Sequence, residues 1–186
     1  MDIKLTSLAD GTAEEFHYLE ELERSLDHDA TSVMLDLLRT TDRETGYPIS
    51  PMKHCLQTAT RAFRDNASEE LIVAALLHDV ADAIAPNNHG RVGAEMLRPF
   101  ISERTYWVMA NHSIFQGYYY WHHIGKDRNT REQFRGHPDF EACASFCEKW
   151  DQNSFDPNYE TMPLDAFIPA VTRVLSRQPF TQGSGR

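Results

Sequence analysis

The sequence contains few cysteines: there are three, and no two of them form a CxxC pair. An odd number of thiols without that spacing is typical of a reducing compartment rather than of a disulfide framework. A long apolar run is also missing, because the longest one, Leu71 to Leu77, is far shorter than the roughly 20 residues that cross a bilayer. Met1 to Leu26 shows no basic segment followed by an apolar stretch, so we expect no secretory signal and a cytoplasmic protein.

Basic residues are scarce as well. The chain has 18 Lys and Arg against 28 Asp and Glu, which gives a formal net charge of -10. Binding to nucleic acid or to an anionic membrane depends on neutralising phosphates, and no run of Lys and Arg is present. We therefore expect neither partner. The 186 residues predict one domain, 1–186, that can bury a substantial core and that ends in a flexible tail at 178–186.

Strand patterns are absent too, since no alternating β-branched stretch is bounded by hairpin turns. Helical spacing of apolar residues predominates, which predicts an all-α bundle. Irregular segments rich in Gly, Pro, Asp and Asn are expected at 42–51, 125–137 and 151–163. The expected helices span Ala13 to Leu26, Ser32 to Arg39, Pro51 to Asn66, Ser68 to Ala83, Asn88 to Leu97, Glu103 to Tyr119, Pro138 to Lys149 and Pro163 to Arg177.

Two metal-ligating side chains end the most apolar of these helices. His78 and Asp79 follow the run LIVAALL, and their burial costs free energy unless they are paired or bind a metal. Consecutive helical residues point about 100° apart. His78 can therefore hold one metal ion while the two oxygens of Asp79 reach that ion and a second one.

Further ligands are available for both ions. His54 lies on the preceding expected helix and Asp151 lies just past a later one, so with the HD pair they complete a site of two imidazoles and two carboxylates. His89 and His112 add two imidazoles, which a second metal needs beside the shared carboxylate. Satisfied polar residues of an ordinary core would be the alternative, but all six fall in order across the chain.

A histidine, an HD dipeptide and a late aspartate in this order resemble the signature of the HD-domain superfamily, and two histidines between HD and the late aspartate mark its dinuclear members. Within it the chain most resembles the small mixed-valent diiron oxygenases, typified by 2-amino-1-hydroxyethylphosphonate dioxygenases and more distantly by myo-inositol oxygenases. The resemblance covers about 46–177. It rests on the segments KHCLQTA, AALLHDV, NHGRVGAEMLRPF, ANHSIF and EKWDQNSFDPNYETMPLDAFIPAV.

The resemblance implies a compact HD-domain bundle around an Fe(II)/Fe(III) pair, with O2 as co-substrate. Such an enzyme oxidises a small hydroxylated metabolite and cleaves the C-P or C-C bond next to the hydroxyl-bearing carbon. A monomer and a small homo-oligomer both fit this reading. The iron ligands that it implies are His54, His78, Asp79 as the bridge, His89, His112 and Asp151.

The chain departs from the phosphonate enzymes at four positions. Asp82 stands where they have a histidine, Gln116 and Glu148 where they have cationic phosphonate contacts, and Tyr47 at or near an acidic loop residue. We take Asp82 and Tyr47 as candidate catalytic residues, and Asp82, Gln116 and Glu148 as candidate substrate contacts. An acidic pocket of this kind repels a dianion and favours a neutral polyol or a cationic amino alcohol. Asp82 could instead orient the imidazole of His78.

Two other functions use part or none of this chemistry. An HD-domain phosphohydrolase would use the same ligands with Mn, Fe, Mg or Zn to polarise a nucleotide or other phosphate ester. It needs cationic phosphate clamps, and the departing positions hold none, which favours the oxygenase. A metal-free regulatory module would require all six ligands to be vestigial.

The remaining motifs have structural interpretations. The run GYYYWHH at 117–123 could cage a quaternary ammonium, but a helix with one core face and one wet face is favoured. The cationic loop at 126–135 is expected to be solvated rather than to supply charge to the site. We expect Cys143 and Cys147 in the core, and Trp150 packed over the site.

Overall fold

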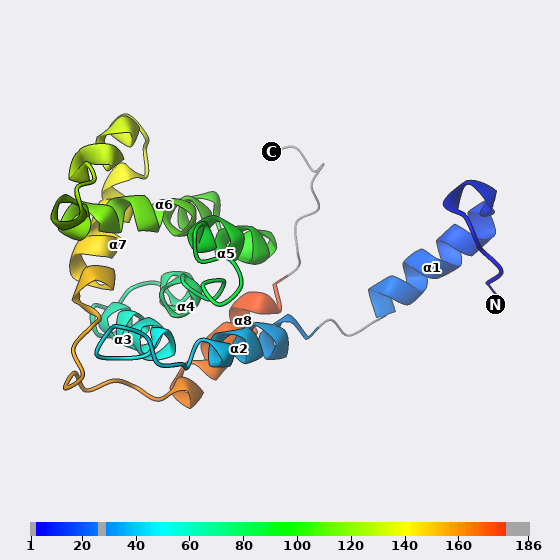
Figure 1. The fold of residues 1–186 in the computed structure, drawn as a ribbon. Helices are drawn as coiled ribbons and strands as arrows, with labels where there is room; N and C mark the ends of the chain where they lie inside the picture. Colours follow the sequence, from blue (N-terminus) through cyan, green and yellow to red (C-terminus); the bar gives the residue numbers. More distant parts are fainter. Residues whose placement is uncertain (1–2, 26–28, 178–186) are drawn as a thin grey trace.

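The computed structural model describes residues 3–25 and 29–177. Within these residues every regular element is a helix and there is no strand, which confirms the all-α prediction (Figure 1). Short 3-10 helices lie between several α-helices, at Leu8–Asp10, Arg98–Phe100, Trp121–Ile124, Arg128–Phe134, Asp151–Asn153 and Leu164–Ala166. The α-helices are α1 (Ala13–Ser25), α2 (Ala30–Thr40), α3 (Pro51–Arg64), α4 (Glu69–Leu77), α5 (His89–Leu97), α6 (Glu103–Tyr120), α7 (Phe140–Lys149) and α8 (Ile168–Leu175).

Helix α4 forms the centre of the bundle. Its last five residues, 73–77, are fully buried. It packs against α3, α6 and α8, while α5 packs along α6 and α6 along α7. Figure 1 shows α4 between α3 and α5, with α1 lying away from the other helices. Because α4 is apolar all round, it is the buried helix from which the HD pair emerges.

Most helices begin where the sequence predicts, but α4 ends at Leu77 instead of Ala83. Beyond it, the amide of Val80 donates to Leu77 O and the amide of Asp82 donates to Asp79 O, which are turns rather than α-helical bonds. The apolar run therefore continues beyond the helix because the turn is buried too: Val80 and Ala81 are fully buried. The HD pair lies on this turn.

Three further differences concern element boundaries. The predicted helix from Pro163 is divided into the 3-10 helix Leu164–Ala166 and α8, whose second residue is Pro169. Proline has no amide hydrogen and suits a first turn, so it favours a new start there. Helix α7 begins at Phe140, two residues after Pro138, and the segment predicted as irregular contains the 3-10 helix Arg128–Phe134.

All three cysteines are buried and free, as predicted for Cys143 and Cys147. Among the described helices, none is long and apolar enough to cross a membrane. The expected end of the first helix at Leu26 and the expected tail at 178–186 lie outside the described residues.

Candidate metal centre

Four imidazoles converge in the bundle with the same hydrogen-bonding pattern. Each places Nδ1 next to a backbone carbonyl oxygen, and because a carbonyl only accepts, Nδ1 must carry the hydrogen. The lone pair of each neutral ring then lies on Nε2, the atom free to bind a metal. The four Nδ1 to oxygen distances are 2.8 Å from His54 to Ser154, 2.9 Å from His78 to Ala75, 2.9 Å from His89 to Pro86 and 2.7 Å from His112 to Met109.

The first group consists of His54, His78 and Asp151, which come from α3, the turn after α4 and the segment after α7. All three are buried. The Nε2 atoms of His54 and His78 lie 3.1 Å apart, and Asp151 Oδ1 is 3.1 Å from the first and 3.6 Å from the second. Two facing lone pairs repel each other, so this arrangement requires a cation between them. The donor atoms therefore fit a metal ion.

Asp79 joins this group to a second one. Its Oδ2 is 3.6 Å from Nε2 of His54 and 3.4 Å from Nε2 of His78. Its other oxygen, Oδ1, is 3.1 Å from Nε2 of His89 and 3.1 Å from Nε2 of His112. Each carboxylate oxygen thus faces one pair of imidazoles, which is the arrangement of a bridging ligand. The six residues together are called the metal cluster below.

The aspartates and histidines of the metal cluster shift each other's pKa values. Burial lowers the pKa of His78, but the carboxylates of Asp79 and Asp151 outweigh this and raise it to about 9. His89 behaves in the same way, because its bond to Asp79 raises its pKa to about 9. The pKa values of both aspartates are lowered despite their burial, through the facing histidines. The carboxylates therefore hold positive charge in this space, as protons or as metal ions.

Gly90 lets α5 approach α6 closely. A Cβ atom there would lie 2.9 Å from Cε1 of His112, and 3.0 Å from both the Met109 carbonyl and Ser113 Oγ. This close approach brings His89 and His112 to the same oxygen of Asp79. Sequence reasoning missed Ser113, whose Oγ lies 3.0 Å from His89 Nε2 and 3.3 Å from His112 Nε2; only its place next to His112 could have indicated it.

Two side chains fix Asp151. Gln116 donates from Nε2 to Oδ1 of Asp151 at 2.6 Å, and the Cys147 thiol lies 3.8 Å from Oδ2. Burial raises the pKa of Cys147 well above its usual range, so the thiol keeps its hydrogen. Gln116 was predicted to contact substrate, and its contact with a metal-cluster carboxylate is an additional role.

A cleft of about 170 Å³ opens onto the metal cluster. Asp82, Gln116 and Tyr47 are among the residues that line it, whereas Glu148 is not. Glu148 is exposed on α7, because Cys147, one position before it, faces the core and the side chains are about 100° apart. The lining residues are Thr45, Tyr47, Ile49, Ser50, Pro51, His54, Asp79, Asp82, His89, Gln116, Tyr120 and Phe155.

Asp82 forms an ion pair at the edge of the cleft. Its Oδ2 accepts a hydrogen bond of 3.1 Å from Arg43, and its Oδ1 lies 3.9 Å from Nδ1 of His89. The alternative role, orienting His78, belongs to the carbonyl of Ala75. Arg43 was not predicted, and it offsets part of the negative charge expected of this pocket.

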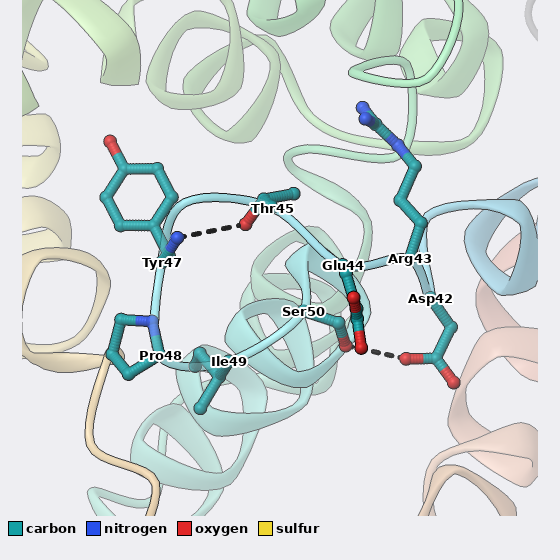
Figure 2. Close-up of a pocket in the computed structure, with 8 residues that line it drawn as sticks. All are labelled: Asp42, Arg43, Glu44, Thr45, Tyr47, Pro48, Ile49 and Ser50. Carbon is teal, nitrogen blue, oxygen red and sulfur yellow. Dashed lines mark hydrogen bonds between the residues drawn. The ribbon is translucent and has the colours of Figure 1, made fainter.

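The loop at 42–50 separates the cleft from a second cavity of about 390 Å³. Figure 2 shows this loop, in which Ser50 Oγ donates to Asp42 Oδ1 at 2.6 Å and so joins its two ends. Tyr47 is 64% exposed, and its ring lies 5.3 Å from that of Phe155. Phe155 in turn stacks on His54 at 4.5 Å. An aromatic wall, Tyr47 and Phe155, therefore covers one side of the cleft.

Of the remaining expectations, the one for Trp150 is corrected, whereas the run GYYYWHH and the cationic loop keep the structural interpretations that the sequence favoured. Trp150 does not line the cleft: its Nε1 donates to Asp65 Oδ2 at 2.8 Å and its ring packs on Phe146. In the run GYYYWHH only Tyr120 lines the cleft, so these residues form no cage around it. Arg128 and Arg131 lie over the ring of Tyr118, at 4.1 and 3.7 Å, instead of reaching the cleft.

The described residues form an all-helical bundle, and its metal cluster brings together histidines and aspartates of several helices that could hold metal ions. A family model described as HD domain matches residues 52–139, which contain five of the six cluster residues. Only Asp151 lies beyond the match. No curated protein matches the chain. An HD domain is therefore found within the chain, and its buried histidines and aspartates could hold metal ions.

Proposed function

We propose that the protein is a nonheme diiron oxygenase, which uses O2 to oxidise a small hydroxylated metabolite and to cleave the bond next to its hydroxyl-bearing carbon. One observation carries this proposal. The cleft that leads to the metal cluster is lined by carboxylates, imidazoles, hydroxyls and aromatic rings, and its described lining includes neither Lys nor Arg.

The composition of the lining separates the two candidate reactions. Phosphoryl transfer needs cationic groups on the phosphate oxygens as charge develops. Arg43, which belongs to the loop at 42–50 but is not among the lining residues, is paired with Asp82. A phosphate dianion would meet Asp82 at the rim, whereas a polyol or an amino alcohol would find hydrogen-bond acceptors there.

The residues divide into holding and positioning groups. His54, His78 and Asp151 would hold one iron, His89 and His112 the other, and Asp79 would lie between the two. An iron pair of this kind supplies O2 binding and one-electron chemistry.

The protein's own groups supply the rest. Gln116 fixes the Asp151 carboxylate by its 2.6 Å hydrogen bond. Phe155 and Tyr47 give one side of the cleft an aromatic surface, and Asp82 would accept a hydrogen bond from a hydroxyl or ammonium group at the rim. The side chains of the protein, rather than the metal ions, would therefore orient the substrate in the cleft.

The deciding experiment is metal analysis with spectroscopy on protein expressed with iron and purified without oxygen. We expect two irons per chain, a coupled mixed-valent EPR signal after partial oxidation, and a change in that signal on adding polyols or amino alcohols. O2 consumption with one of these compounds would establish the reaction. Asp79→Ala protein is the control. Divalent metals with phosphatase turnover and no O2 uptake would instead identify a phosphohydrolase.

A further inference from the structure

Helix α3 holds the segment that follows Asp151 along one stripe of side chains. His54, Gln57 and Arg61 are three and four residues apart, so they lie on one face of the helix. Each donates a hydrogen bond to a backbone carbonyl of this segment. The distances are 2.8 Å from His54 to Ser154, 2.6 Å from Gln57 to Asp156 and 2.8 Å from Arg61 to Asn153.

Phe155 lies between two of these anchored carbonyls, those of Ser154 and Asp156. Its ring stacks on His54, with centroids 4.5 Å apart and planes 30° apart, and it lines the cleft. Because the peptide group before Phe155 and the carbonyl of the next residue, Asp156, are both held, the backbone on either side of Phe155 is anchored to α3. The aromatic wall of the cleft thus depends on side chains of α3.

Gln57 is the member of this stripe whose role is otherwise unexplained. His54 belongs to the metal cluster, and Arg61 also stacks on Tyr159 with its guanidinium 4.0 Å from the ring. Gln57 is fully buried, and a buried amide is costly unless its hydrogen bonds are made. Its Nε2 donates to Asp156 O, whereas its Oε1 has no hydrogen-bond partner among the described residues, so the amide is retained at a cost. A methionine would fill similar space without an amide. What the glutamine adds is the bond to Asp156 O.

We propose that Gln57 is a positioning residue that fixes Phe155 as a wall of the cleft, and that Phe155 limits the size of the substrate group beside the metal cluster. Gln57 is not among the residues that line the cleft, so it acts through the Asp156 peptide. The positioning role stands independently of the reaction. The size limit rests on the proposed oxygenase function.

The positioning role is tested with protein labelled with 4-fluorophenylalanine, in which Phe155→Leu assigns the fluorine line of Phe155. Gln57→Met removes the hydrogen bond at equal chain length. Thr60→Val is the matched control, because buried Thr60 accepts a hydrogen bond from the Met162 amide at 3.1 Å, on the same segment but farther from Phe155. We expect the Phe155 line to shift and broaden in Gln57→Met and to stay in place in Thr60→Val.

Gln57→Asn keeps the amide but is one methylene too short to reach Asp156 O, so it should shift and broaden the Phe155 line in the same way. It replaces Gln57→Met in the test if Gln57→Met folds poorly. An unchanged Phe155 line in both Gln57 variants would overturn the proposal. So would equal movement of all phenylalanine lines in the Gln57 and Thr60 variants, which would indicate general loosening.

The size limit is tested by O2 consumption of the iron-loaded protein with amino alcohols and diols of increasing chain length. We expect Phe155→Ala and Gln57→Met to raise the rate with longer compounds relative to the shortest, and Thr60→Val to leave the ratio unchanged. An unchanged ratio in Phe155→Ala would overturn the limit. If the wild type consumes no O2 with any compound, the proposed function fails, while the fluorine result still decides the positioning role.

Discussion

At the residue scale, the central feature is one carboxylate that faces two pairs of imidazoles. The two oxygens of Asp79 lie 3.1 to 3.6 Å from four Nε2 atoms. Each of these rings is oriented by a backbone carbonyl, so the lone pairs are fixed before any metal arrives. The consequences of removing the shared ligand and of removing an unshared one therefore differ.

Asp79→Ala should abolish the binding of both metal ions, because each ion loses a ligand and the compensating negative charge. His112→Ala and His89→Ala should each remove mainly the second ion, since His54, His78 and Asp151 still hold the first. Metal content per chain, measured after gel filtration, tests this. Retention of two ions by all three variants would show that the ligand assignment is wrong.

Gly90→Ala should lower the occupancy of the second ion while largely sparing the first. The new methyl group would lie 2.9 Å from His112 Cε1, so the ring or the whole of α5 must move, at about 1 to 3 kcal/mol of stability. Gly93→Ala is the control on the same helix, because its nearest contact would be 3.4 Å from the carbonyl of His78. Equal metal loss in the two variants would contradict this role of Gly90.

At the scale of elements, one carboxylate joins three helices. Glu70 in the first turn of α4 accepts hydrogen bonds from the amide and the hydroxyl of Ser102, at 3.0 and 2.6 Å, and from Thr105 Oγ1 at 2.6 Å. It also pairs with Arg177 after α8. Partial burial raises the pKa of Glu70, but these bonds outweigh it and lower the pKa to about 2.

Glu70→Gln should reduce the free energy of unfolding at pH 7 by about 1 to 2 kcal/mol, because two hydroxyls and one amide lose a charged acceptor. The lowered pKa means that the carboxylate stabilises the fold fully above about pH 4.5 and loses this effect as the pH falls toward 2. The difference in free energy of unfolding between wild type and Glu70→Gln, measured by urea denaturation, should therefore become smaller as the pH is lowered.

Glu69→Gln provides the matched comparison, since Glu69 only pairs at the surface with Arg173, whose side chain is 62% exposed. Its loss of stability should be smaller. A gap between wild type and Glu70→Gln that stays constant from pH 7 to pH 3 would contradict the role given to the ionised carboxylate.

At the scale of the whole molecule, the metal cluster joins segments from residue 54 to residue 151. Its residues come from α3, the turn after α4, α5, α6 and the segment after α7, so binding of a metal ion there would be coupled to folding. A ligand that binds only the folded chain stabilises it by mass action.

Chelation should therefore lower the melting temperature of the protein substantially. At a free metal concentration of about 1,000 times Kd the stabilisation is about 4 kcal/mol, and about 2 to 4 °C accompany each kcal/mol at this chain length. Calorimetry with and without EDTA measures the shift. The melting temperature of Asp79→Ala should change little on adding EDTA. An equal shift in that variant would show that the stabilising metal ions bind elsewhere than at the metal cluster.

The sequence by itself determined the helical class and the residue types of the site. Apolar spacing of 3.6 residues is a local property, so α3, α5 and α6 begin and end close to their predicted positions. The His and Asp side chains of the metal cluster were identified because buried ionisable groups need partners, wherever they come from. Glu148 shows the limit of such local reasoning. A shift of one position along α7 turns a side chain from the core to solvent, and the sequence did not show on which side Glu148 lies.

Only the tertiary structure decided which groups surround these ligands. The carbonyls of Ser154 and Met109 leave no mark in the sequence, because every residue has one, and Phe155 reaches the cleft through hydrogen bonds from a helix about 100 residues earlier. Helix α4 ends at Leu77 although the apolar run continues, because the buried turn after it directs Asp79 toward both pairs of imidazoles. The partners of the histidines, the position of Phe155 and the end of α4 depend on contacts between distant segments, and the local spacing of apolar residues carries no information about such contacts.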